Sequence, residues 1–305
     1  MKPEDINNAK IAFSPLNWGM GHVSRSISLI NQLMLQGNSI CIFCNAEQKA
    51  IYQKYFLNIE YKDFEPYRFY FGPSGFSTLK FLISIPTLIK GYRKEKKILS
   101  DYLKQNPIDY IISDQRYGFR KKGVFSIFIT HQCRLSLPWH LKVGQMINKQ
   151  LIKSFNRIWI MDNASNQFAG RLSKTNLSRI NYIGIKSRFE LMPTGTHKPY
   201  RVLILNGPKP FHEFLMNHFK NELNKIDYII GDPPKNNQLI QKIVEWDKAD
   251  NIISQACEIY SFCGYSTLMD IQFLKCKWYC IPTPRQFEQA YLYKKTLAEG
   301  QGFHN

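Results

Sequence analysis

The chain has 305 residues, of which 44% are hydrophobic, so it is long enough for two ordinary domains and too apolar for intrinsic disorder. No stretch reaches the roughly 20 apolar residues that a membrane-spanning helix needs. The polar N-terminus MKPEDINNAK is unlike a secretory signal. Seven scattered cysteines without such a signal predict reduced thiols in a cytosol.

The formal net charge of +18 indicates which classes of partner the protein can bind. It fits nucleic acid, an anionic membrane surface or phosphorylated substrates as a partner, and a solvated lysine-rich surface explains it as well. The sequence contains no RNA-binding fingerprint, zinc-finger spacing or basic zipper, so we expect no nucleic-acid partner.

Apolar, β-branched runs alternate with helical patterns along the whole chain. Runs that are apolar at nearly every residue are typical of parallel strands buried on both faces, and their alternation with helices predicts α/β units. A helix is expected over Val23–Gln36, ended by Gly37. The predicted strands are Lys10–Leu16, Ser39–Asn45, Ile108–Ser113, Phe125–Thr130, Arg157–Met161, Arg201–Asn206, Asp227–Ile230 and Trp278–Ile281.

The loop after the first predicted strand reads PLNWGMGH and ends at His22. Gly19 and Gly21 let the backbone approach a ligand at the start of the next helix. The dinucleotide fingerprint fails, because Ser24 stands in place of its last glycine, so NAD and FAD are not expected. Open α/β sheets bind ligands at the carboxyl ends of strands, which makes His22 a candidate general base. The alternative is a histidine that only caps or packs the helix start.

Asp114 and His131 stand at the ends of two further predicted strands. A carboxylate at the position of Asp114 can orient His22 or take a proton itself, or it can pair with Arg116 and close a loop. His131 can line the same site, or it can be structural, as a lone histidine more often is.

The segment Phe76–Leu99 joins an apolar half to the basic cluster Arg93–Lys97. A basic amphipathic stretch of this kind can lie in a membrane interface beside anionic lipid. The alternative is a helix that packs on its own sheet and has a solvated, charged end. We expect Pro86 to kink any helix in this segment.

The sequence gives no sign of a metal site. Cys41 and Cys44 match C-x-x-C, but they lie on a predicted strand, where residues three apart point to opposite faces. Patterns such as H-E-x-x-H, the P-loop and Asp-x-Asp do not occur. We therefore expect neither a metal nor another resident cofactor.

A break rich in Pro, Gly and Thr falls at Met192–Pro199, and a new strand–turn–helix pattern follows it. It predicts two domains, residues 1–192 and 200–305. Gly207, after the first strand of the second domain, is the counterpart of the Gly19–His22 loop and could face a phosphate.

The stretch Ser261–Gln289 has the pattern of a nucleotide site made from two loops. Gly264 begins a turn into a helix, with Thr267 as the expected N-cap and Asp270 reaching back in a capping box. Such a helix start favours a phosphate, and a capped surface helix is the alternative. The second loop leads to another helix, in which Gln286 and Gln289 are expected on one face.

The chain resembles glycosyltransferases of the GT-B fold in a series of segments that occur in the same order along nearly its whole length. The resemblance is to the family-28-like group of the N-acetylglucosaminyltransferase that completes the peptidoglycan lipid precursor, and it is closest to uncharacterised bacterial members. The segments that carry it are Pro15–His22, Ile112–Gly118, Ile129–Gln132, Asp162, Ala169–Ser173, Tyr182–Gly184, Gly264–Asp270 and Pro282–Gln289.

This resemblance implies two Rossmann-like domains with a cleft between them. The N-terminal domain would hold the acceptor, on the side of Gly19, Gly21 and His131, and the C-terminal domain would hold a uridine diphosphate sugar. His22 would be the base, assisted by Asp114, in a metal-independent reaction that inverts the anomeric centre. The resemblance places Gly264, Ser266 and Thr267 at the diphosphate, Asp270 at the ribose, and Glu288 and Gln289 at the sugar. The expected donor site also includes Gly207, Arg285 and Gln286.

The chain departs from the family pattern at the donor side. Phe262-Cys263 stands where relatives have an arginine, and Arg285 stands where they have a glycine. Lys209-Pro210-Phe211 replaces a polar-arginine pattern, and the closing helix that relatives often have after Gly302 is not expected. Arg285 could replace the missing positive charge.

The predicted function is transfer of a hexose, with N-acetylhexosamine as the expected sugar, to a lipid-linked or saccharide acceptor of the cell envelope. The expected location is the cytoplasm, with peripheral association at the inner face of the membrane. The alternatives are a nucleotide-sugar epimerase of the same fold and a non-catalytic protein that binds sugars or membrane surfaces.

Overall fold

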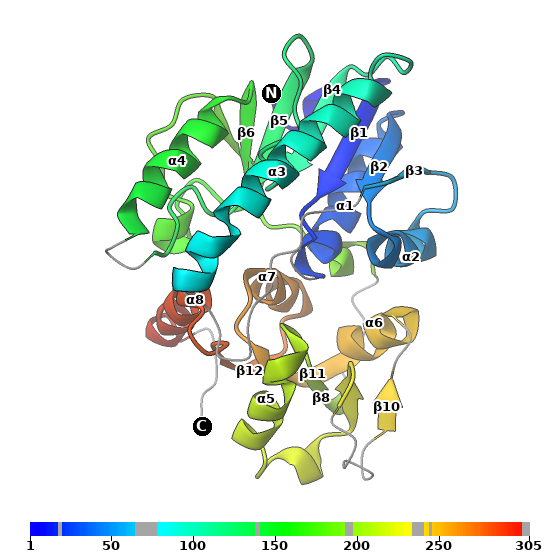
Figure 1. Ribbon diagram of the computed structural model, residues 1–305. Coiled ribbons are helices and arrows are strands. Elements are labelled where there is room, and N and C mark those ends of the chain that lie inside the picture. The colour runs from blue at the N-terminus through cyan, green and yellow to red at the C-terminus, as the bar shows by residue number, and fades with distance from the viewer. Residues whose placement is uncertain are drawn as a thin grey trace. The chain divides into compact units, whose positions relative to one another are not determined.

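Residues 1–17, 20–64, 78–137, 141–192, 198–233, 241–243 and 246–300 are described by a computed structural model (Figure 1), with the backbone alone at 78–84, 241–243, 246 and 247. They form two compact units, the first ending at Lys186 and the second beginning at Ser187. The break that the sequence pattern indicates, Met192–Pro199, follows shortly after, and its residues 193–197 lie outside the described part.

The first unit is built on a seven-stranded sheet in the order β3-β2-β1-β4-β5-β6-β7, and every strand pair in it is parallel. Strand order reverses between β1 and β4, which are neighbours in the sheet although far apart in the sequence. The strands are β1 (Lys10–Pro15), β2 (Ser39–Cys44), β3 (Glu60–Asp63), β4 (Tyr110–Asp114), β5 (Phe125–Thr130), β6 (Arg157–Ile160) and β7 (Ile180–Tyr182).

Four helices connect these strands: α1 (Gly21–Leu35), α2 (Ala46–Tyr55), α3 (Thr78–Tyr102) and α4 (Lys142–Lys153). The strands read as apolar runs because both faces are covered; Ile11, Ala12 and Phe13 of β1 are all fully buried. In Figure 1, α3 crosses in front of this sheet. α3 runs through Pro86 without interruption and packs Leu99 into the core.

The second unit holds a five-stranded parallel sheet in the order β10-β9-β8-β11-β12. Here the order reverses between β8 and β11. The elements are β8 (Lys198–Ile204), α5 (His212–His218), β9 (Tyr228–Ile230), β10 (Gln241–Ile243), α6 (Trp246–Gln255), β11 (Ala256–Phe262), α7 (Tyr265–Leu274), β12 (Lys277–Ile281) and α8 (Phe287–Ala298).

All eight predicted strands are present, with ends that differ by up to three residues. Four strands have no counterpart among the predictions. Three of them, β3, β7 and β10, are strands of three or four residues at or beside a sheet edge. The fourth, β11, is internal to its sheet, and its apolar pattern is interrupted by Glu258, whose carboxylate lies 3.0 Å from Nε of Arg201 on β8.

Among the described helices none is long and apolar enough to cross a bilayer.

The thiols of Cys41 and Cys44 are both buried in β2, and burial raises the pKa of each to about 12, so both stay protonated and unreactive.

Candidate functional site

The first cluster of polar groups lies where strand order reverses in the first unit. Open α/β sheets bind ligands at such a point, outside the carboxyl ends of the two strands. Pro15, the last residue of β1, is aligned with Asp114, the last residue of β4. α1 begins at Gly21, so His22 lies in its first turn, and Nδ1 of His22 is 2.9 Å from Oδ2 of Asp114. The sheet thus brings together the two residues that the sequence proposed as base and orienting carboxylate.

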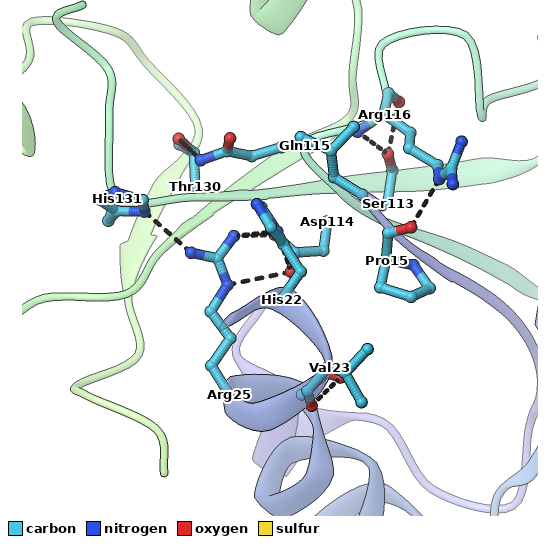
Figure 2. A network of polar contacts seen from close by, with 12 residues as sticks. Pro15, His22, Val23, Arg25, Ser113, Asp114, Gln115, Arg116, Thr130 and His131 are labelled. Atoms are coloured by element: carbon cyan, nitrogen blue, oxygen red, sulfur yellow. Dashed lines mark hydrogen bonds and ion pairs between the residues drawn. The ribbon is translucent and has the colours of Figure 1, made fainter. Parts of the chain in front are cut away.

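Arg25 also belongs to this cluster (Figure 2). It was not among the residues that the sequence predicted for the site. Its side chain is almost fully buried, and Nε donates to Oδ2 of Asp114 at 3.0 Å while Nη2 donates to Oδ1. Nη2 also lies 2.7 Å from Nδ1 of His22, and Nη1 lies 3.0 Å from Nδ1 of His131. The available signal was the spacing of three between His22 and Arg25, which places both on one face of a helix.

The cluster changes the protonation chemistry of its members. Burial opposes ionisation of Asp114, but the charges of Arg25 and His22 and their hydrogen bonds outweigh it and hold the pKa of Asp114 below its usual range. Burial and then the charge of Arg25 lower the pKa of His22 to about 4, although Asp114 acts in the opposite direction. His22 is therefore a neutral imidazole beside a carboxylate at neutral pH, as a general base requires.

The alternative pairing of Asp114 with Arg116 is wrong. Gln115, between them, has φ of +58°, a left-handed conformation that turns the chain after β4. Arg116 instead lies 2.7 Å from Oε1 of Glu95 on α3, and its Nε donates to the carbonyl of Pro15 at 2.6 Å. Gly19, expected on the acceptor side, lies outside the described residues.

A second polar site lies at the corresponding reversal in the second unit, between the ends of β8 and β11. Asn206 links the two strand ends: Nδ2 donates to the carbonyl of Phe262 and to Oγ1 of Thr267, each at 3.0 Å, and Oδ1 accepts from the amide of Phe262 at 2.8 Å. Gly264 is the N-cap of α7 and has no side chain with which to cap it. The prediction of Thr267 as N-cap is therefore wrong, because α7 begins two residues earlier, at Tyr265.

Gly207 and Thr283 complete this second site. Gly207 has φ of +80°, and a methyl carbon added to it would lie 3.3 Å from Cδ2 of Phe262 and 3.6 Å from Oγ1 of Thr283. Oγ1 of Thr283 is buried and has no hydrogen-bond partner. A buried hydroxyl without a partner costs free energy, so it marks a place where a ligand oxygen can bind. Thr283 had no role in the sequence prediction, although it lies in the Pro-Thr-Pro turn that ends β12.

Asp270 does not form the predicted capping box. Its carboxylate instead accepts from Oγ of Ser187 at 2.6 Å and from Nη1 of Arg188 at 2.9 Å. Nε of Arg188 also donates to Asp250 on α6 at 2.6 Å. Ser187 and Arg188 begin the second unit, so these bonds tie its first residues to two of its helices.

The residues of the second predicted loop are placed differently from one another. Gln289 is buried on α8 and its Oε1 accepts from the amide of Thr283 at 2.8 Å, whereas Gln286 is the N-cap of that helix rather than a member of its face. Glu288 lies in the first turn of α8. Arg285 is exposed and has φ of +59°, a conformation that favours glycine.

Phe262 and Cys263 are both fully buried, so neither takes the place of a charged group at a surface. The Phe262 ring belongs to the apolar core of the second unit and stacks on Phe214 with ring centroids 6.5 Å apart. Within the described part of the chain, no three His, Cys, Asp or Glu side chains are grouped as metal ligands.

Comparison with solved structures identifies the fold. The glycotransferase of kitacinnamycin matches with a TM-score of 0.67 at 13% identity, over 97% of this chain and 86% of that one. MurG of Acinetobacter baumannii matches with a TM-score of 0.58 at 14% identity, over 97% of this chain and 85% of that one. LpCGTa in complex with UDP matches with a TM-score of 0.65 at 13% identity, over 97% of this chain and 84% of that one. The sequence itself matches no family profile and no curated protein. The chain has the GT-B glycosyltransferase fold, with two parallel α/β sheets.

Proposed function

We propose that this protein is a glycosyltransferase that moves a sugar from a uridine diphosphate sugar to an acceptor hydroxyl. The observation that carries the proposal is the hydrogen bond of 2.9 Å between His22 and Asp114 at the strand reversal of the first unit. In a fold shared with glycosyltransferases, a neutral histidine held by a buried carboxylate is suited to remove the proton of an attacking hydroxyl.

His22 would act through Nε2, because Nδ1 faces Asp114. The acceptor oxygen attacks the anomeric carbon opposite the diphosphate, and the new carbon–oxygen bond forms as the bond to the phosphate oxygen breaks. The hydroxyl proton goes to Nε2 of His22, and the electron pair of the broken bond leaves with UDP. A single displacement of this kind inverts the anomeric centre.

The second unit would bind the donor. The first turn of α7 has the partial positive charge of a helix N-terminus and no side-chain cap, and a diphosphate is the ligand that such a helix start favours. Thr283 offers its unpartnered hydroxyl beside Gly207. We assign the diphosphate to Gly207, Gly264, Ser266, Thr267, Thr283 and the positive charge of Arg285, and we retain Gln286, Glu288 and Gln289 as contacts of the sugar.

Three finer points of the proposal depend on the family resemblance: N-acetylhexosamine as the sugar, a reaction without a metal, and Asp270 at the ribose. Asp270 already accepts from Ser187 and Arg188, so a ribose contact would use a carboxylate that is partly engaged. Thermal stabilisation by a panel of nucleotide sugars, with and without a chelator, tests the sugar and the metal together, since a bound ligand raises stability according to its affinity.

We also propose that the first unit associates with an anionic membrane surface. On α3 the exposed residues Ile85 and Ile89 continue, at helical spacing, into exposed Arg93 and Lys97. On α4 the exposed apolar side chains Val143, Met146 and Ile147 share one face, and Lys142 and Lys153 are exposed at its two ends. An exposed apolar face with flanking lysines suits an interface that contains acidic lipids.

Vesicle sedimentation tests this association. Binding should require anionic lipid and should fall for Met146→Ser, while Leu57→Ser serves as the control, because Leu57 is 90% exposed but lies outside α3 and α4. Equal binding to neutral vesicles, or none, would contradict the proposal.

The decisive experiment for the activity compares two variants in the same assays. His22→Ala should lower transfer by about 10²–10⁴-fold, which is the usual contribution of a general base, with UDP binding unchanged in calorimetry. Thr283→Val should weaken UDP binding by about tenfold, the loss of a hydrogen bond to a charged group, while Thr296→Val, whose hydroxyl already bonds the carbonyl of Leu292, should not. Full transfer by His22→Ala would remove His22 as the base, and no binding of any nucleotide sugar would refute the function.

A further inference from the structure

We propose that Arg25 is a positioning residue that holds the Asp114 carboxylate against His22, keeps His22 from taking up a second proton, and fixes the proton-bearing nitrogen of His131. This inference rests on the proposed function for its role in catalysis, but its geometric part concerns the free protein. It follows from how the five N–H groups of one buried guanidinium are shared among three side chains (Figure 2).

One edge of the Arg25 guanidinium is committed to Asp114. Nε donates to Oδ2 and Nη2 donates to Oδ1, a two-point contact that sets the plane of the carboxylate as well as its position. Asp114 is fully buried and Arg25 is about 2% exposed, so water cannot replace either partner. Lysine has no planar fork and cannot reproduce this contact.

The remaining edge of the guanidinium faces the two imidazoles. Nη2 lies 2.7 Å from Nδ1 of His22, and Nη1 lies 3.0 Å from Nδ1 of His131. A guanidinium is always charged and has no acceptor atom, so a histidine nitrogen that bonds to it must be the acceptor. For His131 this means that the ring proton lies on Nε2.

For His22 two partners compete for the same nitrogen. Oδ2 of Asp114 at 2.9 Å holds Nδ1 when it carries a proton, and Nη2 of Arg25 at 2.7 Å holds it when it does not. A base that accepts at Nε2 must carry its other proton at Nδ1, so the form held by Asp114 is the reactive one. Arg25 holds the carboxylate in place for that form and disfavours the doubly protonated ring.

The charged and titratable groups that face His22 come from three elements: Arg25 on α1, Asp114 at the end of β4 and His131 after β5. Asp114 favours the imidazolium, and Arg25 opposes it. Removing the guanidinium should therefore leave Asp114 unopposed and allow His22 to accept a proton at higher pH. A purely structural arginine would change stability without moving this titration.

The experiment is a histidine nitrogen NMR titration of the free, full-length protein with Arg25→Gln, Arg25→Lys and Arg116→Gln. In Arg25→Gln the midpoint of His22 should rise by about 1–3 pH units, the size that a nearby charge produces, and His131 should lose its single Nε2–H form. Arg25→Lys keeps the charge but not the fork, so the His22 midpoint should stay low while the His131 signature is lost. Arg116→Gln removes another buried, ion-paired arginine and should change neither signal.

An unchanged His22 midpoint in Arg25→Gln, or an equal shift in Arg116→Gln, would overturn the proposal. If Arg25→Gln does not fold, the test is whether His131 loses its single Nε2–H form in Arg25→Lys. Persistence of that form would refute the role of the planar guanidinium. Where transfer is measurable, the acid limb of kcat/KM for Arg25→Gln should move upward with the NMR midpoint. The titration needs no substrate, so a shift without any transferase activity would refute the proposed function alone.

Discussion

The two strand reversals of this molecule carry opposite kinds of chemistry. At the first, between β1 and β4, the buried side chains of Arg25, Asp114 and His131 and the partly exposed His22 bond to one another. At the second, between β8 and β11, the groups are uncharged: two glycines, a bare helix start and a buried hydroxyl without a partner. The same sheet topology thus gives one unit a cluster of mutually paired charged groups and the other a set of uncharged polar groups that includes a hydroxyl without a partner.

This difference predicts how each site responds to change. The first should be costly to break, because removing one charge leaves another buried without its partner. The second should be costly to fill at Gly207, which has φ of +80° and lies close to the Phe262 ring. Four substitution experiments, in order of expected effect, test this contrast.

The largest effect is expected from Asp114→Asn, which leaves Arg25 buried without a carboxylate. It should lower the free energy of unfolding by about 3–5 kcal/mol in urea denaturation. Asp250→Asn in the second unit is the matched control, because Arg188 keeps Asp270 as a partner, and a loss near 1 kcal/mol is expected there. Equal losses in both variants would show that the first cluster is not mutually dependent.

Next in size is a pH dependence of stability that His22 in the first cluster should cause. The pKa of His22 is about 4 in the folded protein and 6.5 in the unfolded chain, so between these values only the unfolded state takes up the proton. Stability should therefore fall by about 3 kcal/mol as pH decreases from 6.5 to 4. Asp114, whose pKa is lowered, should add a further loss below pH 4.

The control for this window is His22→Gln, in which the slope between pH 6.5 and 4 should flatten. Burial raises the pKa of Asp270, and this carboxyl changes stability in the opposite direction over acid pH. Its contribution is the same in both proteins and cancels in the difference. A difference curve without slope would show that His22 titrates normally in the folded state.

A smaller effect is expected from Gly207→Ala in the second unit. Its φ of +80° and the contact of 3.3 Å with Phe262 should together cost about 1–2 kcal/mol in thermal unfolding. Gly300→Ala is the control, because its φ is +64° but a methyl group there would meet nothing within 4 Å, so only about 1 kcal/mol of backbone strain is expected. UDP binding should weaken in Gly207→Ala alone, and unchanged binding would remove Gly207 from the donor site.

The smallest effect is expected from Arg285→Gly. Relief of the left-handed conformation at φ of +59° should raise stability by up to about 1 kcal/mol. Lys275→Gly, at φ of +54° after α7, should give the same gain. If Arg285 contacts the donor, only its variant should also bind UDP more weakly, and equal binding by both variants would assign Arg285 no role there.

The sequence predicted the strands well because parallel strands buried on both faces are apolar throughout, as Ile11–Phe13 of β1 are. It also predicted His22 and Asp114 as neighbours, with His131 at the same site as one of two alternatives, since strand ends gather at one edge of a parallel sheet. It missed β11, in which Glu258 interrupts the pattern and is compensated by Arg201 from a distant strand. Local pattern cannot show such a long-range partner.

What the sequence by itself determined is the alternation of strands and helices, the glycine-containing turns at strand ends and the residues that follow them. Only the tertiary structure decided which polar groups meet. Arg25 lies on the helix of His22, but its role became visible only once β4 placed Asp114 and β5 placed His131 beside it. Thr283 stands out only because packing buries its hydroxyl and gives it no partner. The physical reason is that hydrogen bonding and burial depend on neighbours far away in the sequence, which folding alone brings into contact.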